Sequence, residues 1–567
     1  MNDMAGLPIT RHMLTVAGGR IVHYRRLGSG PPAVLVHPSP TNSEYVIPLM
    51  RLLAPFCTCF AFDTPGFGSS DALPSEELTV PDLADALAEA FEAIGMPAIP
   101  VFGTHTGAAI AVELARRHPA RVLGVVADGL PALDADELSP LLEGYLIKIR
   151  PDVLGSHYTA LWTRFRDQLI WFPWTSRQVS NLQRAEIASP MQIHPWLVTM
   201  LRAGNGYRPP YKAALTYGDE AIRAVAVMTQ PALFMCKSSD MLFSHLDRLP
   251  PLRQGQSLMR LGSDPTAYED AVRDAMTAYL GTDPPPVSQD ALSRQAEEGL
   301  SPQAGTGFVG APGKQLFIRR HLVASPDAPA GLVLLHDVPG TSARFKTMMR
   351  RLQRNVFAPD LPGCGESDPI ADASPALDLF AEQVMAALAP VVPAPFELYG
   401  RGFGAALAAR IARNYPERVS RLLLDAPVIV EDEAARLTMR EQMAPPIVIT
   451  AEGAHWYRTW LALRDSEVYW PWYETHTANL LRREGEFDAE ALHDRTLEVM
   501  KQHETYGLLV PAALDSRLIE DAAKFSGEIV LRLSGIPVLD AVLSRIEAPW
   551  RVISAKADIF SRVSCWF

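Results

Sequence analysis

The feature that most constrains the fold of this chain is an internal repeat, because landmarks of its first half return about 300 residues later. The segment DTPGFGSSD at Asp63–Asp71 returns as DLPGCGESD at Asp360–Asp368. His37 closes the apolar run AVLVH, and His336 closes the matching run LVLLH. A repeat of domain length predicts two domains of one architecture in tandem.

The repeat extends into an aromatic-rich region of each half. The order and spacing of its landmarks are kept there, so an insertion in the first copy has a counterpart in the second. The first copy carries Gly155, His157, Trp162 and Arg166, and the second carries Gly453, His455, Trp460 and Arg464.

Within each copy, short apolar runs alternate with longer segments of helical period. In the first copy, runs at 34–37 and 57–62 precede helical patterns at 80–94 and 107–118. This alternation is typical of an α/β fold, in which crossover helices connect the strands of a parallel sheet.

The boundary between the copies follows from composition. Residues 282–307 are polar, contain both Pro and Gly, and have almost no apolar period, as expected for a linker. We therefore expect the first domain at residues 1–281 and the second at 308–567.

Charge and cysteine content exclude several classes of protein. The 567 residues contain 52 Lys and Arg against 64 Asp and Glu, and no basic tract, so we expect no nucleic-acid partner. The five cysteines lack CxxC spacing, so neither a disulfide framework nor a metal site is predicted. No apolar run approaches the roughly 20 residues that cross a bilayer, and no signal segment opens the chain. We expect a cytoplasmic protein that does not bind membranes.

Each copy also has a Gly-x-x-x-Gly turn between an apolar strand and a helix. It reads GTHTG at Gly103–Gly107 and GRGFG at Gly400–Gly404. Glycines at such a turn let the helix approach the strand that precedes it. Together with the strand ending in His37 and the DxxGxGxS-like segment from Asp63 to Ser70, this order of motifs resembles the α/β-hydrolase superfamily, twice over nearly the whole chain.

The resemblance implies two α/β-hydrolase-like domains, each with a mostly parallel sheet, flanking helices and a helical cap. It places the caps at about 130–224 and 427–545, and the family's acid at Asp240 and Asp558. Because the sequence stops at Phe567, we expect the second copy to lack its last strand and helix. The exposed sheet edge would then dock onto the first copy, form a homodimer or lower the solubility.

The chain departs from the family at the nucleophile. Where the family has serine, the first copy has His105 and the second has Gly402, and the first copy has no histidine after its last strand. An imidazole at this turn reaches farther than a serine hydroxyl, so we expect His105 to contact Asp240 directly. Such a dyad would act as a base toward water or a substrate proton, or as a nucleophile.

The remaining candidates follow from their positions in the family pattern. The backbone N–H groups of Ser39 and Thr106 are expected to form an oxyanion hole. His37, His157, Trp162 and Arg166 are candidates for substrate binding. The competing interpretation of the cap residues is structural, because they recur in the copy whose turn carries glycine.

Two hypotheses on function remain. The first is a cofactor-independent hydrolase or lyase of a small carbonyl compound, such as an ester, lactone or activated acyl group, with its site in the first copy and no metal. The second is a catalytically inactive protein that binds a small apolar ligand or a partner chain.

Overall fold

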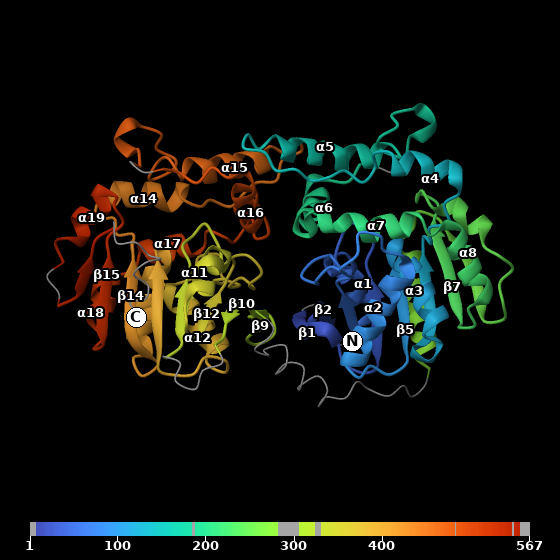
Figure 1. Cartoon of the computed structure of the whole chain (residues 1–567), viewed down its shortest axis with the longest axis horizontal. Coiled ribbons are helices and arrows are strands. Elements are labelled where there is room, and N and C mark those ends of the chain that lie inside the picture. The colour runs from blue at the N-terminus through green and yellow to red at the C-terminus, as the bar shows by residue number, and fades with distance from the viewer. Residues whose placement is uncertain are drawn as a thin grey trace. The chain divides into compact units, whose positions relative to one another are not determined.

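The computed structural model describes residues 7–183, 187–281, 305–323, 330–481, 484–546 and 549–555. The chain divides into two compact units (Figure 1). The first comprises Met1–Arg150 and Thr159–Ser301, and the second comprises Pro151–Tyr158 and Pro302–Phe567. Most of the predicted linker at 282–307 lies outside the described residues. Its predicted end is too late, because strand β9 (Thr306–Val309) already begins there.

The first unit contains an eight-stranded sheet in the order β1-β2-β4-β3-β5-β6-β7-β8. The pairs β1/β2 and β2/β4 are antiparallel, and the other pairs are parallel. This confirms the predicted mostly parallel sheet. In chain order the strands are β1 (Thr10–Thr15), β2 (Ile21–Leu27), β3 (Pro32–Val36), β4 (Thr58–Phe62), β5 (Ile99–Thr104), β6 (Val122–Asp128), β7 (Ala232–Lys237) and β8 (Gln256–Leu261).

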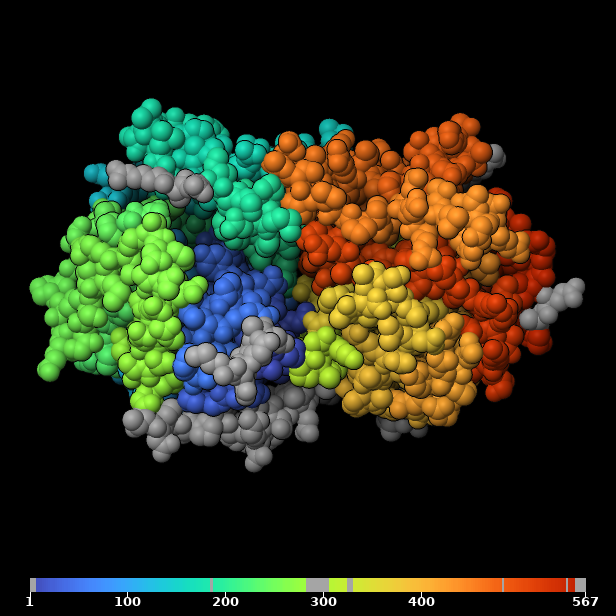
Figure 2. Space-filling view, turned by 180° about the vertical axis from the view of Figure 1, so that it is seen from behind, coloured from blue at the N-terminus to red at the C-terminus, as the bar shows by residue number. Residues whose placement is uncertain are grey.

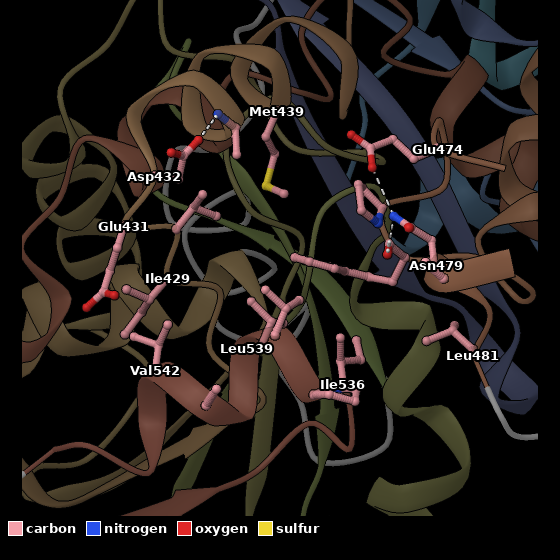
Figure 3. A pocket seen from close by; sticks show the side chains of 18 of the residues that line it. Ile429, Glu431, Asp432, Met439, Glu474, Asn479, Leu481, Ile536, Leu539 and Val542 are labelled. Carbon is pink, nitrogen blue, oxygen red and sulfur yellow. Dashed lines mark hydrogen bonds between the residues drawn. The ribbon is translucent and has the colours of Figure 1, made fainter. Parts of the chain in front are cut away.

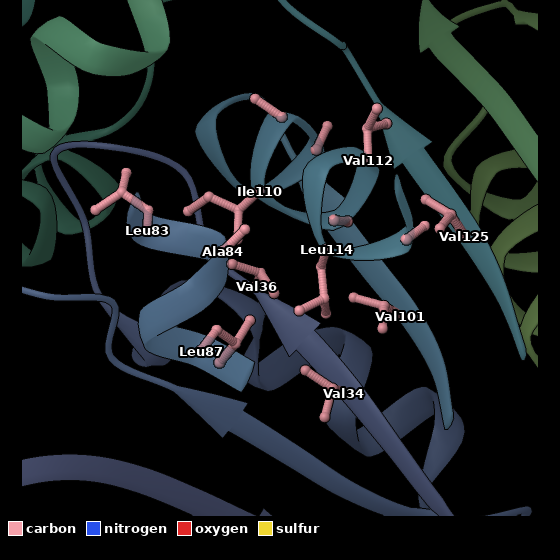
Figure 4. Packing of buried hydrophobic residues seen from close by; sticks show 14 of the residues in the cluster. Val34, Val36, Leu83, Ala84, Leu87, Val101, Ile110, Val112, Leu114 and Val125 are labelled. Carbon is pink, nitrogen blue, oxygen red and sulfur yellow. The ribbon is translucent and has the colours of Figure 1, made fainter. Parts of the chain in front are cut away.

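Helices cover both faces of this sheet. Helices α2 (Val80–Ala93), α3 (Thr106–Arg117) and α8 (Gly218–Val227) share one core cluster, and α1 (Ile47–Leu53) and α9 (Pro265–Leu280) contribute to the other. In Figure 4, leucine and valine side chains of α2 and α3 meet those of β3 and β5. Each helix therefore buries one face against the sheet, and the central strands β3, β4 and β5 are buried on both faces.

Local sequence sets the N-terminal end of α2. The Thr79 side chain accepts the Asp82 backbone N–H, and the Asp82 carboxylate accepts the Thr79 N–H at 2.8 Å. This capping box satisfies N–H groups that have no partner inside the helix. The predicted start of this helix behind Thr79 is confirmed.

The second unit repeats the architecture with the order β16-β15-β14-β13-β11-β12-β10-β9. Its other strands are β10 (Leu316–His321), β11 (Leu332–Leu335), β12 (Val356–Pro359), β13 (Phe396–Arg401), β14 (Val419–Asp425), β15 (Glu528–Arg532) and β16 (Arg551–Ile553). The helices that flank this sheet are α11 (Lys346–Arg351), α12 (Leu377–Leu388), α13 (Phe403–Asn414), α17 (Leu509–Leu514), α18 (Leu518–Ala523) and α19 (Pro537–Leu543).

The end of this sheet corrects two predictions. Strand β15 pairs with β14 as β7 pairs with β6, and β16 then takes the place of β8, so the last strand is present. The cap therefore ends before Glu528, not near residue 545. The predicted match of Pro549–Asp558 to the acid-bearing strand is one strand too late. Asp558 and any last helix lie outside the described residues.

Each unit carries a helical insertion between its sixth and seventh strands. In the space-filling view, the teal surface of the first insertion lies above the blue and green surface of its unit (Figure 2). Within the first insertion, α8 contacts α3, so the end of the predicted cap belongs to the sheet layer. The remaining helices are α4 (Ala135–Leu142), α5 (Ser156–Ile170), α6 (Pro190–Ala203) and α7 (Arg208–Leu215), and in the second unit α14 (Glu433–Gln442), α15 (Ala454–Asp465) and α16 (Ala489–Met500).

Among the described helices, none is both long and apolar enough to cross a membrane.

The close approach of α3 to the sheet gives a test of the fold. A Cβ at Gly107 would overlap the backbone carbonyl of Val36, whereas a Cβ at Gly262 would meet nothing within 4 Å. Gly→Ala inside a helix normally stabilises by about 1 kcal/mol. We expect Gly107→Ala to destabilise instead, by about 2 kcal/mol or more, because backbone must move. Chemical denaturation measures this, with Gly262→Ala as the matched control, and a stabilised Gly107→Ala protein would contradict the close approach.

Candidate active site

The strand-to-helix turn of the first unit holds His105 in an uncommon backbone conformation. His105 lies between β5 and α3 with φ of 50° and ψ of −112°, and its N–H donates to the Asp128 carbonyl at 2.9 Å. A Cβ at Gly103 would overlap the Gly107 carbonyl, so the sharp turn depends on both glycines. Strain of this kind is found where a side chain must be presented to a site.

The predicted contact between His105 and Asp240 is present. Asp240 follows β7, and its Oδ2 lies 2.8 Å from His105 Nε2. The other oxygen, Oδ1, accepts the Leu242 N–H at 2.8 Å, which fixes the carboxylate. The two side chains are 34% and 24% exposed, so the pair is open to small molecules.

The other ring nitrogen of His105 is available for chemistry. With Asp240 ionised, Nε2 carries the proton that it donates, so Nδ1 holds the lone pair when the ring is neutral. Among the described residues, Nδ1 has no hydrogen-bond partner. The ring itself lies close to Gly129, where a Cβ would be 2.7 Å from His105 Cδ2. A glycine is therefore needed beneath the imidazole.

Electrostatics favour the charged form of this pair. Burial alone would lower the pKa of His105, but the hydrogen-bonded Asp240 carboxylate and nearby Asp128 together raise it to about 9. For Asp240, burial acts to raise the pKa, yet the charge and hydrogen bond of His105 lower it below its ordinary value. At neutral pH the dyad is an imidazolium–carboxylate ion pair.

Three residues near the dyad, Asp128, Tyr268 and Lys237, were not predicted from the sequence. Asp128 ends β6, next to β5 in the sheet, and burial raises its pKa despite the Tyr268 hydroxyl that donates to its Oδ2 at 2.9 Å. The Lys237 ammonium lies 3.7 Å from the centroid of the Tyr268 ring. The recurrence of Asp128 as Asp425 at the end of β14 was a signal that could have revealed it.

The predicted oxyanion-hole residues of the first unit are adjacent. The Ser39 N–H makes a long contact of 3.4 Å with Thr106 Oγ1, and both residues are buried. Pro38, the residue before Ser39, carries no polar side chain that could accept hydrogen bonds from the Ser39 and Thr106 N–H groups. The Ser39 N–H would have to give up this contact to donate to an oxyanion, and the catalytic role of Ser39 and Thr106 stays a prediction.

In the second unit a carboxylate occupies the position that corresponds to the predicted oxyanion hole. His336 matches His37, so Asp337 stands where the first unit has Pro38. Asp337 Oδ1 accepts the N–H of Val338 at 2.8 Å and that of Phe403 at 2.9 Å. These are the two N–H groups that match Ser39 and Thr106.

The Asp337 carboxylate also limits which residue can occupy position 402 in the second turn. A Cβ on Gly402 would overlap the Asp337 carboxylate, and Gly402 has φ of 55°. The second turn therefore holds no side chain, and its anion-binding N–H groups are already occupied by a carboxylate of the chain itself.

Both ring nitrogens of His37 make contacts within the fold. It is buried, its Nδ1 lies 3.0 Å from the Pro38 carbonyl, and its Nε2 accepts the Thr64 N–H at 3.0 Å. Both nitrogens are thus used to join the loops after β3 and β4. These contacts favour a structural role for His37, and substrate binding by His37 stays a prediction. His336 repeats the arrangement by accepting the Leu361 N–H.

The cap candidates also have structural contacts. His157 belongs to the segment that packs with the second unit, and its Nδ1 lies 3.2 Å from Asp152 Oδ2 and 3.3 Å from the Asp152 backbone nitrogen. Its Nε2 lies 3.1 Å from His493 Nδ1. His455 repeats this by accepting the Thr450 N–H at 3.2 Å. Because His157 is buried and both of its nitrogens are engaged, the geometry favours the structural interpretation.

Trp162 and Arg166 lie on α5, where Trp162 is buried and Arg166 is half-buried. Next to Arg166, the Oδ2 atom of Asp167 accepts a hydrogen bond from Nη2 of Arg177 at 2.6 Å. Substrate binding by Trp162 and Arg166 remains a prediction. Among the described residues, no group of three or more His, Cys, Asp or Glu side chains is placed to hold a metal ion.

Comparisons with known proteins agree with this architecture. The family model described as alpha/beta hydrolase fold matches residues 31–258 and 332–445, more than half of the chain. Over 129 residues the chain is 32% identical to 2-hydroxymuconate semialdehyde hydrolase of Pseudomonas sp. (strain CF600), covering 20% of this chain and 46% of that protein. It is 29% identical over 160 residues to haloalkane dehalogenase of Agrobacterium fabrum, covering 28% and 52%. The chain thus spans about half the length of these curated relatives.

Among solved structures, a thermophilic esterase from Thermogutta terrifontis matches with a TM-score of 0.36 and 16% identity, covering 48% of this chain and 99% of that one. E-2-(acetamidomethylene)succinate hydrolase matches with a TM-score of 0.36 and 20% identity, covering 47% and 98%.

The ion pair at the turn gives a test by titration. We expect His105 to titrate at about 9, and Asp240→Asn to lower this pKa toward the ordinary 6.5 or below, because burial then opposes the charge with less compensation. NMR of isotope-labelled histidines would follow the titration, with the His105 signal assigned from its loss in His105→Gln. Asp270→Asn, at an exposed pair with Arg273, is the matched control. Titration near 6.5 in both the native and Asp240→Asn proteins would show that the pair does not form.

Proposed function

Because the chain belongs to the α/β-hydrolase family, we propose that its first unit hydrolyses a small carbonyl compound with His105 and Asp240 in place of the family's serine-centred machinery. The substrate class is an ester, a lactone or an activated acyl group, and no cofactor takes part. The observation that carries this proposal is the 2.8 Å contact between His105 Nε2 and Asp240 Oδ2 at the exposed turn.

In the proposed reaction, neutral His105 acts as a general base through Nδ1. Water attacks the carbonyl carbon, its proton passes to Nδ1, and the carbonyl oxygen becomes an oxyanion. The backbone N–H groups of Ser39 and Thr106 stabilise that charge. Collapse of the tetrahedral intermediate then breaks the bond to the leaving group, which takes the proton from Nδ1.

Asp240 has two effects on this base. Its hydrogen bond selects the tautomer with the proton on Nε2, and its charge stabilises the imidazolium that forms when Nδ1 accepts a proton. The same charge keeps the resting imidazole protonated at neutral pH. The active form therefore accumulates only as the pH approaches the raised pKa of His105, about 9.

We assign the second unit no catalytic part. Its turn carries Gly402, and the Asp337 carboxylate holds the two N–H groups that an oxyanion would need. An anionic intermediate at this place would have to displace a negatively charged group that is already hydrogen-bonded. The unit serves as a non-catalytic scaffold.

Kinetics with site variants tests the mechanism. A panel of esters, lactones, epoxides, haloalkanes and 2-hydroxymuconate semialdehyde would first identify a substrate. We expect His105→Ala to lower kcat by about 10²- to 10⁴-fold, as for loss of a general base. His118→Ala, at the other end of α3 and paired with Asp85, is the matched control and should retain activity.

The pH profile separates a base from a structural residue. Activity should rise with pH through a midpoint of about 9, because half of the His105 rings are neutral at a pH equal to their pKa. Asp240→Asn should move the midpoint of this profile to lower pH and reduce kcat more than it changes KM. Equal rates for the native protein, His105→Ala and Asp240→Asn would reject the mechanism and favour an inactive, ligand-binding protein.

A further inference from the structure

The second unit retains a pocket beside its glycine turn. The pocket has a volume of about 510 Å³ and includes Gly402 and Asp337 in its lining. It is unusual in its charge, because four arginines line it against two acids. The arginines are Arg344, Arg401, Arg495 and Arg532, and the acids are Asp337 and Glu467.

Two of these arginines are neutralised by the chain. Arg532 Nη1 lies 2.7 Å from Asp425 Oδ1, and Arg495 Nη1 lies 2.7 Å from Glu467 Oε1. The remaining acid, Asp337, directs Oδ1 at two backbone N–H groups and makes no ion pair among the described residues.

Arg344 and Arg401 are left without a counterion. Among the described residues, neither guanidinium has a hydrogen bond or an ion pair. Burial, together with the charges of Arg495 and Arg401, lowers the pKa of Arg344 to about 10, so positive charge is crowded at Arg344. At Arg401 burial also acts to lower the pKa, but nearby acids, Asp425 among them, outweigh it and raise the pKa. Arg344 is exposed and Arg401 is half-buried, so an anion that binds here can pair with both guanidinium groups and lower the cost of the half-buried charge of Arg401.

An apolar groove adjoins the charged pocket. It has a volume of about 880 Å³, and both cavities are lined by Trp470, Leu481, Gly535, Ile536 and Leu539, so they meet along one wall. Figure 3 shows Met439 and Leu539 pointing into the groove. An anion held at the arginines could therefore extend an apolar body into this groove.

The outer rim of the groove is acidic. Glu431, Asp432 and Glu474 line it, and Figure 3 shows these carboxylates around its edge. Arg545 also lines the groove and neutralises Glu431, with its Nη2 2.6 Å from Glu431 Oε2, so the net negative charge of the rim comes from Asp432 and Glu474. A ligand with a second negative group at its far end would be repelled there. The arrangement favours one anionic group and an apolar remainder.

From this arrangement we propose that the second unit is a binding site for an amphiphilic organic monocarboxylate, with its carboxylate between Arg344 and Arg401 and its apolar part along Trp470 and Leu539. Planar guanidinium groups bind carboxylates through paired hydrogen bonds, and the apolar wall supplies hydrophobic burial. Inorganic anions lack the second contribution. The site is separate from the proposed catalysis in the first unit and does not depend on it.

Calorimetry on the full chain tests the proposal with octanoate as the probe. Arg344→Gln and Arg401→Gln should each weaken octanoate binding about tenfold or more, because each removes one of the two unneutralised charges. Arg517→Gln, at an exposed arginine outside the pocket, is the matched control and should bind as the native protein does. Thermal melting would show that each variant is folded, and Arg344→Lys should bind with intermediate affinity if it keeps charge but not the paired geometry.

Ligand controls separate the two halves of the site. Octanol should bind at least about tenfold more weakly than octanoate if the arginines hold the carboxylate, and acetate and inorganic phosphate should bind more weakly if the groove matters. Suberate, which carries a second carboxylate, should also be weaker. Octanol binding as tightly as octanoate, or native affinity in folded Arg344→Gln and Arg401→Gln proteins, would overturn the proposal. Loss of binding in His105→Ala alone would place the ligand in the first unit and would also overturn it.

Discussion

The close approach of a helix to a strand at the Gly-x-x-x-Gly turn is the constraint on which both units depend. Gly103 and Gly107 in the first unit, and Gly400 and Gly404 in the second, leave no space for a Cβ. The residue between them takes a positive φ of 50° at His105 and 55° at Gly402. Because the backbone conformation of the turn is the same in both units, the units differ in the side chain that the turn carries, which is an imidazole in the first and absent in the second.

One substitution in a neighbouring loop then separates the units. Pro38 leaves the Ser39 and Thr106 region without a carboxylate, whereas Asp337 accepts both corresponding N–H groups. Asp337 also fills the volume that a side chain at position 402 would need. A side chain at position 402 and the present position of Asp337 therefore exclude each other. The absence of a nucleophile and the occupied anion site have the same steric cause.

The internal repeat and the spacing of the glycines were enough to predict the main features of both units. Both sheets, both turns and the contact of His105 with Asp240 followed from landmarks such as Gly103, Gly107 and the strand that precedes Asp240. Contacts between loops were missed: His37 looked like a pocket residue, but its nitrogens join two loops. Strand β15 was missed because Glu528–Arg532 is short and begins with an exposed charge, while the segment after Pro549 matched the family pattern better. The role of Asp337 could not be predicted, because a carboxylate that accepts backbone N–H groups leaves no periodic signal in sequence.

The pairing of His105 with Asp240 has two opposing effects on His105 as a base. A carboxylate 2.8 Å from an imidazole makes its other nitrogen a stronger base but reduces the fraction that is unprotonated. With a pKa of about 9, about one His105 ring in a hundred is neutral at pH 7. In the serine-based arrangement the carboxylate and the nucleophile lie on opposite sides of a separate histidine, whereas here the turn residue itself must be paired and reactive. A substrate that brings a negative charge close to Asp240 would raise this pKa further, and a neutral one that excludes water would lower it. For the reaction proposed above, electrostatics at the dyad therefore favour neutral carbonyl compounds, while the arginines of the second unit favour an anion.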